Sequence, residues 1–127
     1  MKKSKASINE HAIRRAHLAI SCLPFKKMFY EEIDKKSISA DDLCKRDDWE
    51  RFVFAPFGAE RAEAHFQWMI KLGILRREVD GQGLTSRIRL TPMGRRIIAG
   101  EKGEIKRAGF RARLLELLRR SRSRFQK

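Results

Sequence analysis

Apolar residues recur at helical spacing in several short segments of the chain, and this pattern predicts a mainly helical protein. A first helix is predicted over residues 10–23, with Asn9 as its cap and Pro24 interrupting it. Residues 25–33 predict a second helix. Residues 40–46 predict a short third one, with Ser39 as its cap and two aspartates in its first turn, where negative charge suits the helix dipole. The first part of the chain is therefore expected to form three short helices.

A longer helix is predicted between Gly58 and Gly73. Over residues 59–72, Ala62 and Met69 fall on one apolar face at helical spacing, and Gly73 is placed to end the helix. The positions that this spacing leaves facing outward are Arg61, Glu63, Ala64, Gln67, Trp68 and Lys71. This helix therefore combines a buried face with an outer face that carries charge.

A β-hairpin is predicted directly after this helix. Its strands cover residues 74–80 and 84–90, and Gly-Gln-Gly at 81–83 joins them. In the second strand, apolar residues alternate with polar ones that include Arg87 and Arg89, so one face of the hairpin is expected to be basic.

The end of the chain predicts two more helices. Thr91 is placed to cap one that starts at Pro92 and ends at Gly100. Residues 104–125 predict the other, with a wide leucine stripe and arginines on its other face. This stripe can fold back on its own domain or pair with a second copy of the chain, and residues 119–127 are expected to form a mobile basic arm.

These elements predict one domain with extensions. We expect a flexible basic N-terminus over residues 1–8 and a central domain, with its N-terminal helices, over residues 9–100. A basic C-terminal helix and arm follow over residues 101–127.

The charge balance points to a class of partner. The 127 residues include 30 Lys and Arg against 16 Asp and Glu, a formal net charge of +14. Such a field attracts a polyanion, and nucleic acid is the commonest one in a cell. An anionic membrane surface or an acidic protein would suit the same field.

The location expected from the sequence is the cytoplasm. No apolar run approaches the roughly 18 residues that a membrane span needs, so neither a membrane partner nor a secretory precursor is expected. Cys22 and Cys44 lack the CxxC spacing of a zinc site and do not form a disulfide framework, which indicates a reducing compartment.

Two motifs flank the predicted hairpin. IKLGILRR precedes it and RLTPMGRR ends it. With a basic hairpin between them, the segment from about Ser37 to Gly100 resembles a winged helix-turn-helix domain, as in bacterial regulators of the MarR, PadR and ArsR kind. In that pattern a Gly stands four positions after an apolar helix residue, here Gly73 after Met69, and an LTP-x-G segment leads into the next helix. The resemblance implies a mainly α fold with a small β-hairpin, extended here by N- and C-terminal helices.

The resemblance also implies a contact surface for double-stranded DNA. The helix over residues 59–72 would lie in the major groove, and the hairpin over residues 74–90 would touch phosphates or the adjacent minor groove. The helix positions that carry over are Arg61, Ala64, Gln67, Trp68 and Lys71, and the hairpin positions are Arg76, Arg77, Arg87 and Arg89. Arg and Gln can make bidentate contacts to bases, and a row of arginines can neutralise several phosphates. The function implied is a transcriptional regulator that works as a dimer.

Other interpretations stay open at this point. Glu60 and Glu63 repel phosphate and can instead complement the helix dipole, on a face that binds protein or nothing. Trp68 suits packing against a neighbouring element better than contact with a base. Two rival functions follow: an adaptor that binds another protein through this helix, and RNA binding, for instance on ribosomal RNA, which the arginine-rich tail would suit.

The chain carries no motif for catalysis, a metal or a cofactor. It has no GxxxxGK[ST], GxGxxG, GxSxG or HExxH sequence, and its three histidines are not spaced as metal ligands. We therefore expect a protein that is not an enzyme and uses no cofactor or metal.

Overall fold

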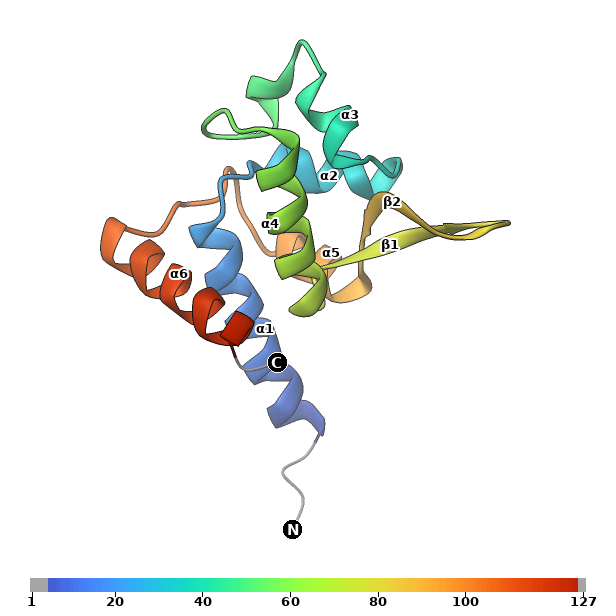
Figure 1. Ribbon diagram of the computed structural model, residues 1–127. Coiled ribbons are helices and arrows are strands. Elements are labelled where there is room, and N and C mark those ends of the chain that lie inside the picture. The colour runs from blue at the N-terminus through green and yellow to red at the C-terminus, as the bar shows by residue number, and fades with distance from the viewer. Residues whose placement is uncertain (1–4, 126–127) are drawn as a thin grey trace.

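Six α-helices, one short 3-10 helix and a two-stranded antiparallel sheet make up residues 5–125, the part of the chain that the computed structural model describes (Figure 1). The mainly helical fold with a small hairpin that the sequence predicts is confirmed. Residues 1–4, half of the segment predicted as a flexible N-terminus, and residues 126–127 lie outside the described residues.

Helix α1 (Lys5–Cys22) begins about one turn earlier than predicted. Asn9 lies inside the helix, so its predicted role as a cap is wrong, and the helix also includes residues 5–8. The helix packs on the core through side chains such as Ile20 and ends before Pro24, as the missing N–H of a proline requires.

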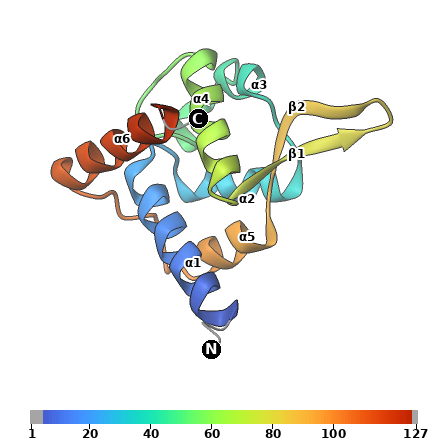
Figure 2. The same cartoon turned by 60° about the horizontal axis from the view of Figure 1, so that its bottom comes forward.

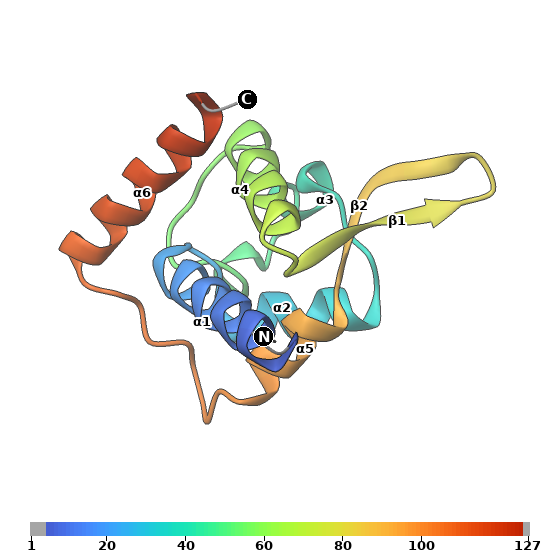
Figure 3. The same ribbon diagram turned by 90° about the horizontal axis from the view of Figure 1, so that it is seen from below.

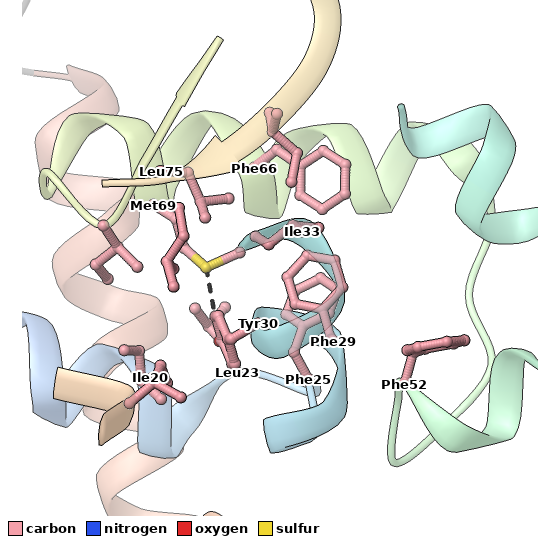
Figure 4. Close-up of a cluster of buried hydrophobic side chains, with 14 of the residues drawn as sticks. Ile20, Leu23, Phe25, Phe29, Tyr30, Ile33, Phe52, Phe66, Met69 and Leu75 are labelled. Atoms are coloured by element: carbon pink, nitrogen blue, oxygen red, sulfur yellow. Dashed lines mark hydrogen bonds between the residues drawn. The ribbon is translucent and has the colours of Figure 1, made fainter. Parts of the chain in front are cut away.

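Helix α2 (Lys27–Lys35) provides the centre of the core (Figure 4). The ring of Phe29 stacks on that of Phe66 with their centroids 5.8 Å apart. The Tyr30 hydroxyl donates a hydrogen bond to the Met69 sulfur at 3.7 Å, and burial raises the pKa of Tyr30. Aromatic packing therefore fixes this helix against the longer helix that carries Phe66 and Met69.

Helix α3 (Ala40–Cys44) begins at the predicted cap. The Ser39 hydroxyl accepts a hydrogen bond from the Asp42 N–H at 3.1 Å, and the Asp42 carboxylate accepts one from the Ser39 N–H at 3.4 Å. This reciprocal pair is a capping box. A connection over residues 45–58 follows, which contains the 3-10 helix η1 (Trp49–Arg51).

Helix α4 (Ala59–Lys71) ends within one residue of its predicted end. The chain then turns at Gly73, whose φ of 84° lies in the left-handed region that favours glycine. The Thr91 hydroxyl donates to the carbonyl of Ile74 at 3.0 Å, which ties this turn to the start of the next helix.

The hairpin follows at once, with strands β1 (Leu75–Asp80) and β2 (Gly83–Leu90). The strands are antiparallel, and their register shifts once, between Arg77 and Val79. An isolated antiparallel bridge joins Ile38 to Ile88, so the segment before α3 pairs with the outer edge of β2.

Helix α5 (Pro92–Ala99) begins as predicted, because the Thr91 hydroxyl accepts a hydrogen bond from the Gly94 N–H at 3.0 Å. A side chain at Gly94 would collide with the carbonyl oxygen of Ile74 and with the Leu90 side chain. The glycine of the LTP-x-G segment therefore allows α5 to pack directly on the base of the hairpin.

Helix α6 (Phe110–Phe125) begins later than the predicted start at Glu104. The preceding residues, 100–109, are not helical, because Ile105 is buried in the core and the Ala108 N–H donates to the carbonyl of Ser21 at 2.8 Å. The helix continues as far as Phe125, so most of the segment predicted as a mobile arm is helical.

The helices form two layers around the aromatic core. In Figure 3, α4 lies in the upper part of the view, between α6 and the hairpin, while α1, α2 and α5 lie below it. The hairpin extends well beyond the helices (Figure 2). Within residues 5–125, no helix is long and apolar enough to cross a membrane.

Candidate nucleic-acid interface

Helix α4 has a buried side and an exposed side. Its buried residues include Ala62, Phe66 and Met69. The exposed residues that we call the α4 ridge are Glu60, Gln67 and Lys71. These three fall on one side of the helix because they are separated by whole turns. The exposure that the sequence predicts for Gln67 and Lys71 is confirmed.

The structure corrects the expected outward position of Trp68, which is only 8% exposed. Its ring lies 5.7 Å from the guanidinium carbons of Arg15 and of Arg120, and 6.0 Å from the Lys71 ammonium nitrogen. Since α1 and α6 supply Arg15 and Arg120, Trp68 packs between three helices and contacts cations through its ring face. It is therefore not positioned to contact a DNA base.

Helix α6 meets α1 and α4 through charged side chains. Glu116 is 4% exposed and forms an ion pair with Arg15 at 3.1 Å. Arg120 donates to the Nδ1 atom of His65 at 3.1 Å and to the carbonyl of Ala64 at 3.4 Å. These contacts place α6 along the side of α4 that holds Ala64, so this expected DNA contact is half-buried.

Three hairpin arginines lie on one face of the sheet. Arg76 and Arg89 are direct cross-strand partners, and Arg87 lies two residues from Arg89, so all three share that face. The Glu78 carboxylate lies 2.8 Å from the Nε atom of Arg89 and 3.9 Å from Arg76. Arg87 donates to the Ser37 hydroxyl at 3.3 Å. Part of the positive charge on this face is therefore balanced within the protein.

Arg77 lies on the other face of the hairpin, so the four hairpin arginines that the resemblance carries over do not share one surface. Arg77 is paired across the hairpin with buried Ile88 and forms an ion pair with Glu63 of α4. The Gln67 amide also donates to Glu63, at 3.3 Å. The ion pair connects the hairpin to α4 and places a cation beside a carboxylate that would otherwise repel phosphate.

The structure thus brings together only part of the expected contact set. Gln67 and Lys71 lie on the α4 ridge, and Arg77 lies beside it. Arg61 is exposed at the start of α4, toward α6. The sequence pattern did not predict that α6 packs on α1 and α4, although one signal was present: Glu116 is the only acidic residue within residues 110–125.

The described residues contain no cluster of three or more His, Cys, Asp and Glu side chains that could hold a metal ion. Burial raises the pKa of the thiols of Cys22 and Cys44, so neither has the lowered pKa of an activated nucleophile.

Comparison with known protein families gives a match that covers most of the chain. No curated protein matches the chain, and no solved structure does. Residues 6–120, nearly the whole chain, match the family described as Npun_F0494-like. The chain therefore belongs to the Npun_F0494-like family.

Proposed function

We propose that this chain is a winged helix-turn-helix protein that binds duplex DNA with the α4 ridge and acts as a transcriptional regulator. The order of elements supports the proposal: α2, the bridge at Ile38, α3, α4 and the hairpin follow one another as in a winged helix. In a winged helix, the second helix of the helix-turn-helix lies in the major groove, and the hairpin lies beside it. Helix α4 corresponds to this second helix.

The observation that carries the proposal is the placement of α4. This helix is exposed along one face of the molecule, and the hairpin and α6 lie on either side of it (Figure 3). The major groove of B-DNA accepts one α-helix, and a helix in the groove needs cationic groups on its flanks for the two phosphate backbones.

The charges around the α4 ridge support the same conclusion. Arg77 on the hairpin side holds Glu63 in an ion pair, and Arg61 lies on the α6 side. On α6 itself, Arg111 and Arg119 are exposed, and Arg119 lies 3.7 Å from the Glu116 carboxylate. The arginines on the other face of the hairpin, Arg76, Arg87 and Arg89, contribute to the general positive field in this proposal and not to the central contact.

DNA binding is tested by fluorescence anisotropy with the full chain and labelled duplex DNA, structured RNA, single-stranded RNA and heparin at matched salt. We expect the duplex to bind most tightly. Lys71→Ala should weaken duplex binding about 3- to 10-fold and reduce the salt slope by roughly 0.9, the loss of one phosphate contact. The matched control is Lys102→Ala, because Lys102 is exposed in the connection between α5 and α6, outside α4 and the hairpin, and carries the same charge.

Base reading is tested at Gln67. Gln67→Ala should reduce the differences in affinity among duplexes selected from a random pool, whereas Lys71→Ala should lower the affinity for all of them alike. Equal losses of duplex affinity in Lys71→Ala and Lys102→Ala would show that the α4 ridge does not contact the duplex. Tighter binding of structured RNA than of duplex DNA would favour the RNA-binding alternative instead.

The ion pair between Arg77 and Glu63 gives a second test of the face. Arg77→Ala should weaken duplex binding by more than Lys102→Ala, because it removes a cation and also leaves the Glu63 carboxylate unpaired beside the DNA. Adding Glu63→Gln should then restore part of the lost affinity. No recovery in the double variant would show that Glu63 does not face the duplex.

A second copy of the chain is a further part of this proposal. Four exposed leucines of α6 favour it: Leu114, Leu115, Leu117 and Leu118. Apolar patches of this kind on a small protein mark interaction sites. In a dimer each copy would contribute one α4 ridge, and the DNA would offset the repulsion between two basic chains. An adaptor that binds another protein through these leucines is the alternative that the same observation allows.

A further inference from the structure

A cavity lies between the N-terminal half of α4 and the C-terminal half of α6. Its volume is about 520 Å³, within the roughly 300–1,000 Å³ that small-molecule sites occupy. Its lining includes two cationic side chains, Arg61 and Arg120, and one acidic side chain, Glu60. None of these was placed in a cavity by the sequence pattern.

Arg120 is held in place at the cavity wall by contacts that include two hydrogen bonds and a cation–π contact. It donates hydrogen bonds to His65 and to the Ala64 carbonyl, and its guanidinium carbon lies 5.7 Å from the Trp68 ring. A guanidinium group fixed in this way loses little conformational freedom when it binds an anion.

Arg61 supplies the second positive charge. Its side chain is exposed and forms no hydrogen bond or ion pair with any side chain that the structure describes. Arg61 stands in the first turn of α4, whose cap residue Gly58 offers no side-chain hydrogen bond, so the helix dipole adds positive potential there. Glu60 in the same turn offsets only part of this charge.

His65 contributes a hydrogen-bonding side chain to the cavity lining but no charge. Because Arg120 donates to Nδ1, that atom accepts and the ring proton lies on Nε2. Burial, with Arg120 and Arg61 next in effect, lowers the pKa of His65 to about 4. The ring is therefore neutral near pH 7, and the two arginines outnumber the one carboxylate.

The remaining walls are apolar or weakly polar. Leu117 contributes an exposed aliphatic side chain, Ala64 a methyl group, and Ser121 a hydroxyl. We propose that this cavity binds a small organic anion, with its phosphate or carboxylate group on Arg61 and Arg120 and its apolar part against Leu117. The site does not depend on DNA binding, and it gives the protein a small-molecule ligand that the sequence does not suggest.

The test uses four probes and the full chain in isothermal titration calorimetry. Phenyl phosphate and benzoate separate the two anionic groups, inorganic phosphate lacks the apolar part, and benzyl alcohol lacks the charge. We expect one of the aromatic anions to bind at least tenfold more tightly than both inorganic phosphate and benzyl alcohol. NMR should show the indole N–H signal of Trp68 shifting on binding, because Arg120 lies over that ring.

Variants locate the site. Arg61→Gln should weaken binding of the aromatic anion at least tenfold, and because Arg61 is exposed and unpaired within the described residues, the fold should persist, as circular dichroism can check. Arg111→Gln is the matched control, since Arg111 is an exposed arginine of α6 that does not line the cavity. Equal losses in both variants, equal binding of benzyl alcohol, or no binding of either aromatic anion at 10 mM would each overturn the proposal.

Discussion

Gly94 shows how one residue controls the packing of α5 on the hairpin. A methyl group there would collide with the Ile74 carbonyl and the Leu90 side chain. We expect Gly94→Ala to lower the free energy of unfolding by about 2 kcal/mol, the usual cost of overpacking.

At Gly100 a methyl group would make only an ordinary contact, 3.4 Å from the Ile97 carbonyl. Gly100→Ala should therefore stabilise the protein by about 0.4 to 1 kcal/mol. Urea unfolding measures both, and a Gly94→Ala variant as stable as the wild type would contradict the packing.

His65 predicts a pH dependence of stability. Its pKa is lowered to about 4 in the folded protein from the ordinary value of 6.5, first by burial and then by Arg120 and Arg61. Between these two pH values the unfolded chain binds a proton that the folded chain does not. The contribution of the neutral His65 ring to the free energy of unfolding is therefore fully present above pH 6.5. It is lost as the pH falls toward 4, by roughly 3 kcal/mol in total.

The contribution of His65 can be separated from that of other groups. Asp34, beside Arg95, also has a lowered pKa, so it too loses stabilisation in acid. The measurement is therefore the difference between wild type and His65→Gln in unfolding free energy, from pH 7 to pH 4. That difference should shrink as the pH falls. A constant difference, or an NMR titration of His65 with its midpoint near 6.5, would show that the ring is not shielded.

At the scale of elements, capping residues allowed accurate predictions. The ends of α3, α4 and α5 follow from Ser39, Gly73 and Thr91, because each satisfies a backbone requirement that depends only on its neighbours in sequence. The start of α6 could not be predicted in this way. It depends on Ile105, which is buried in the core and lies before the helix begins.

The candidate site was predictable only in part. Periodicity correctly placed Gln67 and Lys71 outside the core. It could not show that α6 covers Trp68, because periodicity identifies the face of a helix and not its neighbour. Strand alternation alone separates Arg76 from Arg77, whereas the pairing of Arg77 with Glu63 depends on how the hairpin leans on α4.

The exposed leucines of α6 predict that two copies of the chain associate in a concentration-dependent way. Leu114 and Leu118 are 49% and 57% exposed, while Glu116 of the same helix is buried. If a second copy covers the leucines, sedimentation equilibrium from about 1 to 100 µM should show a dimer, and Leu114→Ser with Leu118→Ser should give a monomer with an unchanged melting temperature. Leu84→Ser at the hairpin tip, where Leu84 is 76% exposed, is the control. A wild-type protein that stays monomeric over this range would rule out the dimer.

Charge is distributed unevenly over the protein. Residues 37–60 contain 3 basic and 6 acidic side chains against a net charge of +14 for the chain. This acidic segment includes α3, which lies at one end of the molecule, while α6 and the hairpin lie on opposite sides of α4 (Figure 1). A polyanion is therefore expected to cross α4 from α6 toward the hairpin and to avoid the α3 end.

Arg61 connects the two proposals, because it is both an expected DNA contact and a wall of the cavity between α4 and α6. A guanidinium group that pairs with a small anion is no longer available to a phosphate of the duplex. We therefore expect a saturating aromatic anion to weaken duplex binding about 5- to 10-fold at constant ionic strength, and the duplex to weaken anion binding by the same factor, as linkage requires. Anisotropy measures the first effect and calorimetry the second. Arg61→Gln should remove the coupling while leaving Lys71-dependent DNA binding measurable. If both ligands bind without affecting each other, the cavity and the DNA face are independent sites, and Arg61 serves only one of them.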